Sequence, residues 1–420
     1  MVISLRKIRI SYITSRSMLN DAKTICLNAI RSCLPAEGVN RVLNMLDIDQ
    51  EVYLVAAGKA AYAMAEEASK HLKIKKGILI SKYGHIKGSI PNVECYEAGH
   101  PIMDENSIKA TEKAIELCSK LKESDIVLFL LSGGASALFE KPLISLQELQ
   151  DLNRQFLSKG LHIEEINTIR KKLSAVKGGK FGQLCKPAKV YSLILSDVLS
   201  DRLDMIGSGP TAFDKSDPKQ ALEIIERYDI EVSDKIRKII MDNRKADPDN
   251  CQNMIIGSVK TLCKSACKEA EKLGYKPIVI SDHIAIEARD AGDLLYQELL
   301  KHQDEHNIAL IMTGETIVHV KGSGLGGRNQ EMVFSQIRNL KGMKDVVMMS
   351  LGSDGTDGPT DAAGGYIDGS SYDALISKGL DYEKILEEND SYHGLQALDS
   401  LIITGPTGTN VNDISIILKK

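Results

Sequence analysis

The sequence predicts an α/β protein that combines a Rossmann-like domain, built on a parallel sheet, with a second, smaller α/β domain. Three observations lead to this fold class. Short, continuous apolar runs alternate with amphipathic helix patterns, which is typical of parallel strands covered by helices on both faces. Several of these runs end directly in loops rich in Gly and Ser. The chain of 420 residues is also too long for one ordinary core.

The first half of the chain contains the clearest strand–loop–helix units. Helical periodicity is expected from Met18 to Leu46 and again in Asp104–Leu121, Ser145–Leu157 and Ile163–Ala175. The expected strands are Val52–Gly58, a run ending at Ser81, a run ending at Gly99, the start of Asp125–Phe139, and Val190–Val198. Ligands of such sheets bind outside the carboxyl ends of the strands. The pattern therefore places Gly58 with Lys59, Ser132–Ala135, and Ser196 with Asp197 on one edge.

A polar stretch rich in Asp and Pro, Asn243–Asn250, is the best candidate for a linker. It divides the chain into an expected N-terminal domain, 1–245, and an expected C-terminal domain, 246–420. The placement of the first 45 or so residues stays open, because they are only recognised as helical. Beyond the linker, strands are expected at Lys276–Asp282 and Ile308–Thr316, and two short strands close the chain.

Composition narrows the classes of partner and the compartment. Apolar residues make up 43% and charged residues 26%, which is typical of folded globular proteins. The net charge of −4 gives no nucleic-acid footprint. No apolar run approaches the roughly 18 residues of a membrane span. The 8 cysteines form no C-x-x-C pair, which favours a reducing compartment and hence a cytoplasmic protein.

Five Gly-containing loops follow apolar strands and carry Ser, Thr or Asp. Glycine lets backbone N–H groups approach a phosphate, and a following helix N-terminus adds partial positive charge. One such loop is more often a plain tight turn, but five together favour a polyanionic ligand. Ser132, Gly133, Gly134 and Ala135 are the strongest candidates for a phosphate or substrate cradle. Neither a P-loop motif nor the protein-kinase motif set is present.

Gly322, Gly324 and Gly327 spell a G-x-G-x-x-G pattern between an apolar strand and a helix. That pattern is the dinucleotide-binding fingerprint in its expected context. However, the acidic residue expected about 20 residues further on is missing. Arg328 follows the last glycine directly, and it suits a terminal phosphate or a carboxylate better than a nicotinamide.

At these motifs the sequence resembles the glycerate 2-kinase family, whose C-terminal part is called the MOFRL domain. The resemblance rests on seven stretches in order, AAGKAAYAMAEEA, EAGHPIMDENS, LLSGGASAL, LSDVLSDRLDMIGSGPT, TGETIVHVKGSGLGGRNQE, SDGTDGPTDAAGG and GPTGTNVNDI. It implies ATP-dependent phosphorylation of D-glycerate to 2-phosphoglycerate with Mg²⁺ or another divalent cation. It also implies an active site in the cleft between the two domains, with Lys59 and Arg328 as catalytic residues.

Other residues carry alternatives that the sequence leaves open. Gly326, Glu315 and Asn410 join the other loop glycines as candidates for substrate or phosphate binding, although Asn410 suits a turn equally well. Asp197 and Asp354 are candidate metal ligands, but Asp is also common in loops for turn reasons. His100 favours a structural role.

Two rival functions remain at this point. One is an NAD(P)-dependent hydroxypyruvate reductase, which the G-x-G-x-x-G pattern supports, and some relatives in the resembled family carry that label. The other is a non-catalytic sensor of nucleotides or sugar acids. In each case the expected partners are small molecules, a hydroxy acid and a nucleotide, with no nucleic acid and no membrane, while a homodimer is left open.

Overall fold

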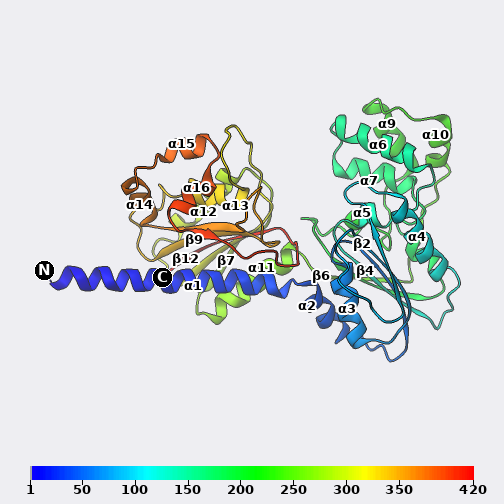
Figure 1. Cartoon of the computed structure of the whole chain (residues 1–420), viewed down its shortest axis with the longest axis horizontal. Coiled ribbons are helices and arrows are strands. Elements are labelled where there is room, and N and C mark those ends of the chain that lie inside the picture. The colour runs from blue at the N-terminus through cyan, green and yellow to red at the C-terminus, as the bar shows by residue number, and fades with distance from the viewer. Residues whose placement is uncertain (1) are drawn as a thin grey trace. The chain divides into compact units, whose positions relative to one another are not determined.

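The computed structural model describes residues 2–420, with side chains from Ser17 onward (Figure 1). Its contacts divide the chain into two compact units. Unit 2 is Pro35–Ile256, and unit 1 joins the segment ending at Leu34 to Gly257–Lys420. Each unit has its own sheet and its own hydrophobic core, which confirms the expected α/β class.

Unit 2 is built on a parallel sheet of six strands, counted over the described residues, in the order β3-β2-β1-β4-β5-β6. Its strands are β1 (Val52–Ala57), β2 (Ile74–Lys82), β3 (Val93–Ala98), β4 (Ile126–Leu131), β5 (Lys189–Leu195) and β6 (Cys251–Gly257). The runs VYLVAA and IVLFLL are almost wholly buried, as expected for strands covered on both faces. The strand order reverses between β1 and β4, which is where ligands of doubly wound sheets bind.

Helices cover this sheet and build a second cluster beside it. They are α2 (Pro35–Leu43), α3 (Ala61–His71), α4 (Glu105–Cys118), α5 (Ala135–Leu138), α6 (Leu146–Ser158), α7 (Ile163–Lys172), α8 (Lys180–Leu184), α9 (Pro218–Arg227) and α10 (Asp234–Met241). Phe129, Phe139 and Phe181 pack against one another in the core in tilted and edge-to-face arrangements, with ring centroids 5.0–5.5 Å apart. A capping box begins α6, because Ser145 and Glu148 satisfy each other's backbone N–H groups.

Unit 1 contains a mixed sheet, in which six described strands follow the order β11-β10-β9-β12-β8-β7. The strands are β7 (Lys276–Ile284), β8 (Ile308–Gly314), β9 (Val346–Gly352), β10 (Gly364–Asp368), β11 (Leu401–Ile402) and β12 (Asp413–Lys419). The last strand inserts antiparallel between β8 and β9. The helices are α1 (Val2–Ser32), α11 (Val259–Lys272), α12 (Ala288–Lys301), α13 (Arg328–Ser335), α14 (Ser371–Ser377), α15 (Tyr382–Glu387) and α16 (Ser391–Ala397).

The division of the chain differs from the expected 1–245 and 246–420 in where α1 belongs. Helix α1 packs on α11, β9 and β12 of unit 1. Asp21 accepts hydrogen bonds from Tyr275 Oη at 2.7 Å and from Lys420 Nζ at 3.1 Å. Thr409 Oγ1 donates to the carbonyl of Cys33 at 2.8 Å. The N-terminal helix is thus part of the C-terminal unit.

The stretch Asn243–Asn250, which was expected to link the two domains, lies inside unit 2. Asn250 Nδ2 donates to the carbonyls of Gly182 at 3.0 Å and Ala188 at 2.8 Å. The stretch leads into β6, the edge strand of the unit 2 sheet, and the boundary falls at Ile256/Gly257. Polar residues of this stretch form hydrogen bonds with the rest of unit 2. Composition alone does not tell whether such residues contact the protein or water.

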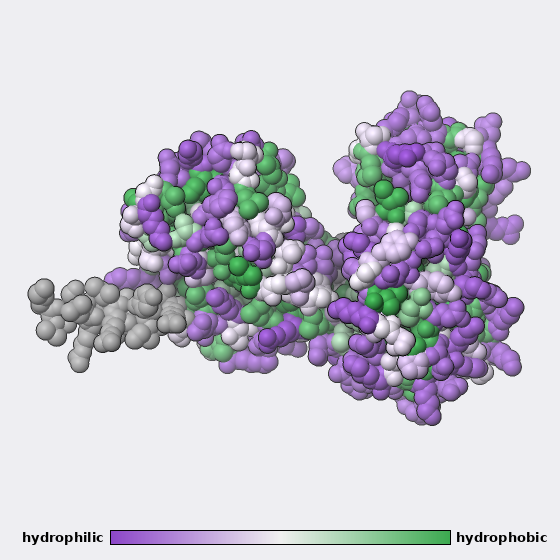
Figure 2. Space-filling view, in the orientation of Figure 1, coloured by the Kyte–Doolittle hydropathy of each residue, from purple (hydrophilic) through white to green (hydrophobic). Residues whose placement is uncertain are grey.

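Charged and polar residues cover most of the face of unit 2 that Figure 2 shows. Among the described residues, no helix has the length and apolar character that a membrane crossing requires.

Candidate active site

Two Gly-containing loops of unit 2 interlock at the carboxyl ends of β1 and β4. Lys59 N donates to the carbonyl of Gly133 at 2.9 Å, and Ala60 N donates to Ser132 Oγ at 3.1 Å. Ser132 N in turn donates to the carbonyl of Ala57 at 3.0 Å. The prediction that these segments share one edge is therefore confirmed. We call the carboxyl ends of strands β1 to β5 the carboxyl edge.

Close approach explains why three glycines occupy this edge. Gly58 has a φ of +127°, and a Cβ there would lie 2.2 Å from Ser132 Oγ. Gly134 has a φ of +87°, and its Cβ would lie 3.0 Å from His100 Cδ2 and 3.3 Å from Lys59 Cγ. A Cβ on Gly133 would lie 2.4 Å from Asp197 Oδ2. The Asp197 carboxylate thus lies against the second loop, where the sequence placed it.

Basic side chains lie at the carboxyl ends of β2 and β3, on the side of Lys59 away from β4. Lys82 ends β2, His100 follows β3, and the Nδ1 atom of His85 lies 3.1 Å from the carbonyl oxygen of Lys59. Burial, and then the charges of Lys59 and Lys82, lower the pKa of His100 below its usual value. Neither lysine has a carboxylate as an ion-pair partner in the part of the chain that the structure describes. The positive charge of this cluster is therefore available to an anion.

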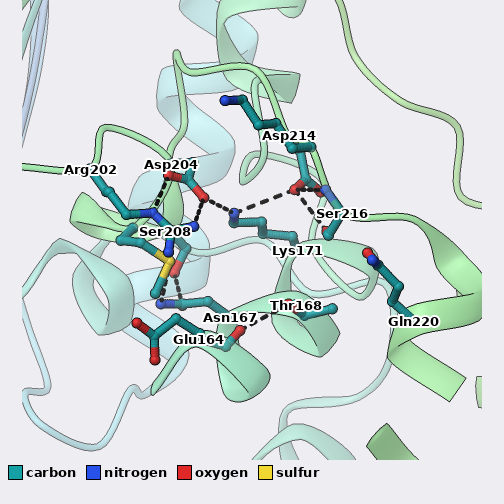
Figure 3. Close-up of polar contacts among 12 residues, drawn as sticks. Glu164, Asn167, Thr168, Lys171, Arg202, Asp204, Ser208, Asp214, Ser216 and Gln220 are labelled. Carbon is teal, nitrogen blue, oxygen red and sulfur yellow. Dashed lines mark hydrogen bonds and ion pairs between the residues drawn. The ribbon is translucent and has the colours of Figure 1, made fainter. Parts of the chain in front are cut away.

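A buried polar network fixes the loop that follows β5 (Figure 3). Lys171 Nζ lies 3.2 Å from Asp204 Oδ2 and 3.4 Å from Asp214 Oδ1, and Lys172 Nζ donates to Asp214 Oδ2 at 2.7 Å. Burial raises the pKa of Asp214, but hydrogen bonds and charges from Lys172 and Lys171 outweigh it and hold the pKa below its usual value. The motif LSDVLSDRLDMIGSGPT belongs to this loop. Asp204 of this motif, Asp214 just beyond it and the paired lysines therefore act as structural ties.

In unit 1, Arg328 begins α13 and is held by two carboxylates. Its Nε donates to Asp413 Oδ2 at 2.5 Å and its Nη2 to Asp413 Oδ1 at 3.0 Å, while Nη1 lies 3.0 Å from Glu315 Oε1. Asn412 Nδ2 donates to the other oxygen of Glu315 at 3.0 Å. Each Nη nitrogen carries a second N–H that these contacts do not use. The guanidinium is thus oriented while still able to donate to a ligand.

Asp413 is the partner of Arg328 that sequence reasoning missed. It opens β12 and is only 5% exposed. Burial raises the pKa of its carboxyl to about 6, although the hydrogen bond and charge of Arg328 lower it. The motif GPTGTNVNDI contains both Asp413 and the predicted binding residue Asn410, whose Oδ1 accepts from Asn412 N at 3.2 Å. Asn410 therefore holds a turn in this structure.

The glycine-rich loop before α13 packs on the protein itself. Gly322 N donates to Asn389 Oδ1 at 3.1 Å, and Gly324 N donates to the carbonyl of Glu388 at 2.8 Å. A Cβ on Gly322 would lie 2.2 Å from Glu388 Cα, and one on Gly326 would lie 2.3 Å from Ser391 Oγ. Phosphate binding by Gly322 and Gly324 would require these hydrogen bonds to break.

The N-terminus of α13 already holds an anion of the protein. Asp357, which is 3% exposed, accepts from Asn329 N at 3.1 Å and from Gln330 N at 2.8 Å. A Cβ on Gly327 would lie 2.3 Å from the carboxyl carbon of Asp357. Burial raises the pKa of Asp357, but four donors from Asn329 and Gln330 stabilise the charged form. In this structure Asp357 takes the position where the dinucleotide fingerprint would hold a pyrophosphate.

The carboxylates fit a divalent cation only as partial ligands. Asp354 Oδ1 accepts from Thr356 N at 3.0 Å and Thr356 Oγ1 at 3.1 Å, which is the turn role left open by the sequence. Asp197 lies beside the loop at Gly133. No group of three or more metal-ligating side chains occurs among the described residues. A Mg²⁺ held by one or two carboxylates together with substrate phosphates fits this arrangement.

Known proteins and family profiles match this sequence over most of its length. The profile of a domain of unknown function, DUF4147, matches residues 21–241, and that of the MOFRL family matches residues 308–413. The D-glycerate 2-kinase of Thermotoga maritima is 47% identical over 95% of this chain and 98% of its own length. The glycerate 2-kinase of Pyrococcus horikoshii is 39% identical over 89% and 88%.

A protein of Agrobacterium vitis, named provisionally as a hydroxypyruvate reductase, is 34% identical over 87% of this chain and 86% of its own. The crystal structure of the glycerate kinase from Thermotoga maritima superposes with a TM-score of 0.93 at 46% identity, covering 96% of this chain and all of that one (100%). The first four stretches that carried the resemblance lie within residues 21–241, and the last three begin within residues 308–413. The chain therefore belongs to the glycerate 2-kinase family, in which a DUF4147 domain is joined to a MOFRL domain.

Proposed function

We propose that this protein transfers the γ-phosphoryl group of ATP to the 2-hydroxyl of D-glycerate, giving 2-phosphoglycerate. One structural observation carries the proposal. Lys59 lies at the point where the strand order of the parallel sheet reverses, and its ammonium group has no carboxylate partner among the described residues. A cation at that position suits an anionic ligand bound at the carboxyl edge. The kinase names of the relatives supply the reaction.

The loop after β4, Ser132–Ala135, suits the phosphate chain of the nucleotide better than the glycine-rich loop before α13 does. No acceptor within the described residues takes the N–H groups of Gly133 and Gly134, so both can donate to phosphate oxygens. Ser132 serves to hold this loop, because its Oγ accepts from Ala60 N. Asp197 would hold the divalent cation beside Gly133. When bound, such a cation neutralises charge on the phosphates.

Lys59 and Arg328 are proposed to neutralise charge that develops on the transferred phosphoryl group. Enzymes catalyse this reaction mainly by positioning the groups and stabilising charge. Arg328 is suited to the task because Asp413 and Glu315 hold its guanidinium plane while the second N–H of each Nη stays free of them. Asp413 and Glu315 then act as positioning residues.

The reductase alternative loses its main support in this structure. Its one sequence feature was the G-x-G-x-x-G pattern, whose glycines pack on residues 388–391 and on Asp357. The N-terminus of the following helix is capped by Asp357 as well. These contacts explain the glycines without a nicotinamide cofactor. The sensor alternative predicts binding of nucleotide and acid without turnover.

The test incubates the purified chain with ATP, Mg²⁺ and D-glycerate, and follows ADP by a coupled assay and the product by NMR. We expect glycerate-dependent ADP release and a single product phosphorylated at C2. A parallel incubation with hydroxypyruvate and NADH or NADPH should show no oxidation above background. Phosphorylation at C3 would contradict the assigned position. Turnover of the nicotinamide alone would overturn the kinase proposal, and tight ligand binding without any product would favour the sensor.

A further inference from the structure

We propose that Lys82, His85 and His100 form, next to Lys59, the site that takes the carboxylate of the acceptor hydroxy acid. This inference rests on the proposed function and deepens it, because it assigns the two substrates to opposite sides of Lys59. The nucleotide phosphates would lie toward β4 and β5, and the hydroxy acid toward β2 and β3.

The order of the strands creates this asymmetry. Along the sheet order β3-β2-β1-β4-β5, the residues at the carboxyl ends are His100, Lys82, Lys59, the Ser132–Gly134 turn, and Asp197. Because all these strands are parallel, their carboxyl ends lie at the same edge. The basic side chains therefore lie on one side of the β1/β4 reversal, and the acidic side chain lies on the other.

Contacts show that the basic residues form one cluster. His85 Nδ1 lies 3.1 Å from the carbonyl oxygen of Lys59, so this nitrogen is the one that donates. A Cβ placed on Gly134 would lie within 3.3 Å of both the His100 ring and the Lys59 side chain. The charges of Lys59 and Lys82 act on the His100 ring and, after burial, are the main influences that lower its pKa.

The nearby carboxylates Glu97 and Asp104 form no ion pair with Lys59 or Lys82 in the described part of the chain, and they hold the loop of this cluster instead. Glu97 Oε1 accepts from Gly84 N at 2.8 Å and from Ile86 N at 3.3 Å, which holds the backbone on both sides of His85. Asp104 Oδ2 accepts from Tyr83 Oη at 2.7 Å, and its Oδ1 caps α4 by accepting from Ser107 N at 3.1 Å. Among the residues whose side chains are described, neither Lys59 nor Lys82 has a carboxylate partner.

The available donors favour a carboxylate over a phosphate chain on this side. The N–H groups of Gly58, Lys59, Ala60 and Ala61 all donate to protein acceptors, so the β1 loop offers no backbone nest. What remains is a set of side-chain donors, the ammonium of Lys82 and the imidazole of His100. Two such donors match the two oxygens of one carboxylate. The backbone donors that suit phosphate are those of Gly133 and Gly134, across the reversal point.

The test measures Lys82→Met and His100→Gln against wild type, with Lys76→Met as the matched control. Lys76 lies on the same strand as Lys82, near its opposite end, and is 57% exposed in its side chain. Loss of one hydrogen bond to a charged group should raise the KM for D-glycerate roughly tenfold or more. The KM for ATP should change less than about twofold, and Lys76→Met should match wild type in both.

A binding measurement does not depend on turnover. It can therefore distinguish failure of this inference from failure of the proposed function. Calorimetry with D-glycerate alone, and with its neutral amide, should show that wild type strongly prefers the acid. Lys82→Met should lose most of that preference, whereas Lys76→Met should keep it.

The outcomes are distinct. A raised KM for ATP with an unchanged KM for glycerate would move the phosphates to this side and overturn the inference. Unchanged binding of acid and amide in both variants would overturn it as well. Wild-type binding of glycerate that depends on Lys82, without phosphorylation, would support this anion site while refuting the kinase proposal. Circular dichroism of each variant shows that a loss does not reflect unfolding.

Discussion

Asp413→Asn is the sharpest test of how Arg328 is held. The substitution removes the charge of a side chain that is 7% exposed and leaves one oxygen to accept from the guanidinium. The new amide N–H₂ then faces the Arg328 N–H groups, which are also donors. Two charge-assisted contacts, at 2.5 and 3.0 Å, are replaced by at most one neutral contact.

The expected change in unfolding free energy depends on how deeply Asp413 and Arg328 are each buried. Removing one partner of a fully buried ion pair costs about 3–5 kcal/mol. Arg328 is 35% exposed in its side chain, so solvent screens part of the loss. Burial of the Asp413 charge offsets most of what remains, as its raised pKa indicates, so we expect a loss of less than about 1 kcal/mol in unfolding free energy at pH 7. The turnover number should fall about 10- to 100-fold, because misorientation of one catalytic group by about 1 Å has effects of this size.

The pH dependence supplies a signature of its own. The pKa of Asp413 in the folded protein is raised to about 6. Its contribution to stability is therefore present below the unfolded-state pKa and is lost as the pH rises through about 6. Activity has the opposite sign, because the ionised carboxylate orients Arg328. Wild-type kcat should fall as the pH drops below about 6, and Asp413→Asn should lack this limb.

The assay is steady-state kinase activity between pH 5 and 8, with urea unfolding of each variant at pH 7. Asp373→Asn is the matched control, because it removes a carboxylate of unit 1 that pairs with Lys341 in an exposed ion pair. That control should stay near wild type in both measurements. The reasoning is refuted if Asp413→Asn keeps more than about a third of wild-type kcat, or if its acid limb is unchanged.

Four further predictions concern activity and stability. Lys59→Ala should lower kcat about 10²–10³-fold while its melting temperature stays near wild type, which differential scanning fluorimetry checks, because the side chain is exposed. Excess EDTA should abolish glycerate-dependent ADP release, and full activity in the chelator would exclude a divalent cation. Asp214→Asn should lower the unfolding free energy in urea by about 3–5 kcal/mol, since Lys172 is 2% exposed. Its wild-type contribution is present above the unfolded-state pKa and lost as the pH falls, because the folded pKa is lowered. Gly134→Ala and Gly160→Ala share the backbone strain of a positive φ, but only Gly134 has neighbours within 4 Å, so only Gly134→Ala should abolish activity.

Much of unit 2 could be predicted from the sequence because its signals are local. Continuous apolar runs such as IVLFLL predict buried parallel strands, and the parallel sheet then brings Gly58, Ser132 and Asp197 to one edge without further information. The capping box at Ser145 is local as well. In such cases, local pattern and global fold agree.

The rest depended on contacts between distant segments. Nothing in the sequence near Arg328 shows that its carboxylate partner is Asp413, 85 residues away. Nor does a Gly-rich pattern tell whether its backbone N–H groups meet a phosphate or, as for Gly324, a carbonyl of the chain. The periodicity of α1 predicted a helix but could not predict which unit would bury its apolar face. These features follow from packing, and packing follows from the whole fold.

The position of α1 has a consequence for biosynthesis. Its buried residues Met18, Ala22 and Ile25 are synthesised before unit 2, but the elements that cover them, α11, β9 and β12, are made only after Ile256. Unit 2 is one contiguous segment, so it can fold before the elements that pack on α1 have been synthesised. During that interval the nascent chain presents an apolar helix face to solvent and to chaperones. Helix α1 is thus synthesised before unit 2 but can pack only after unit 2 is complete.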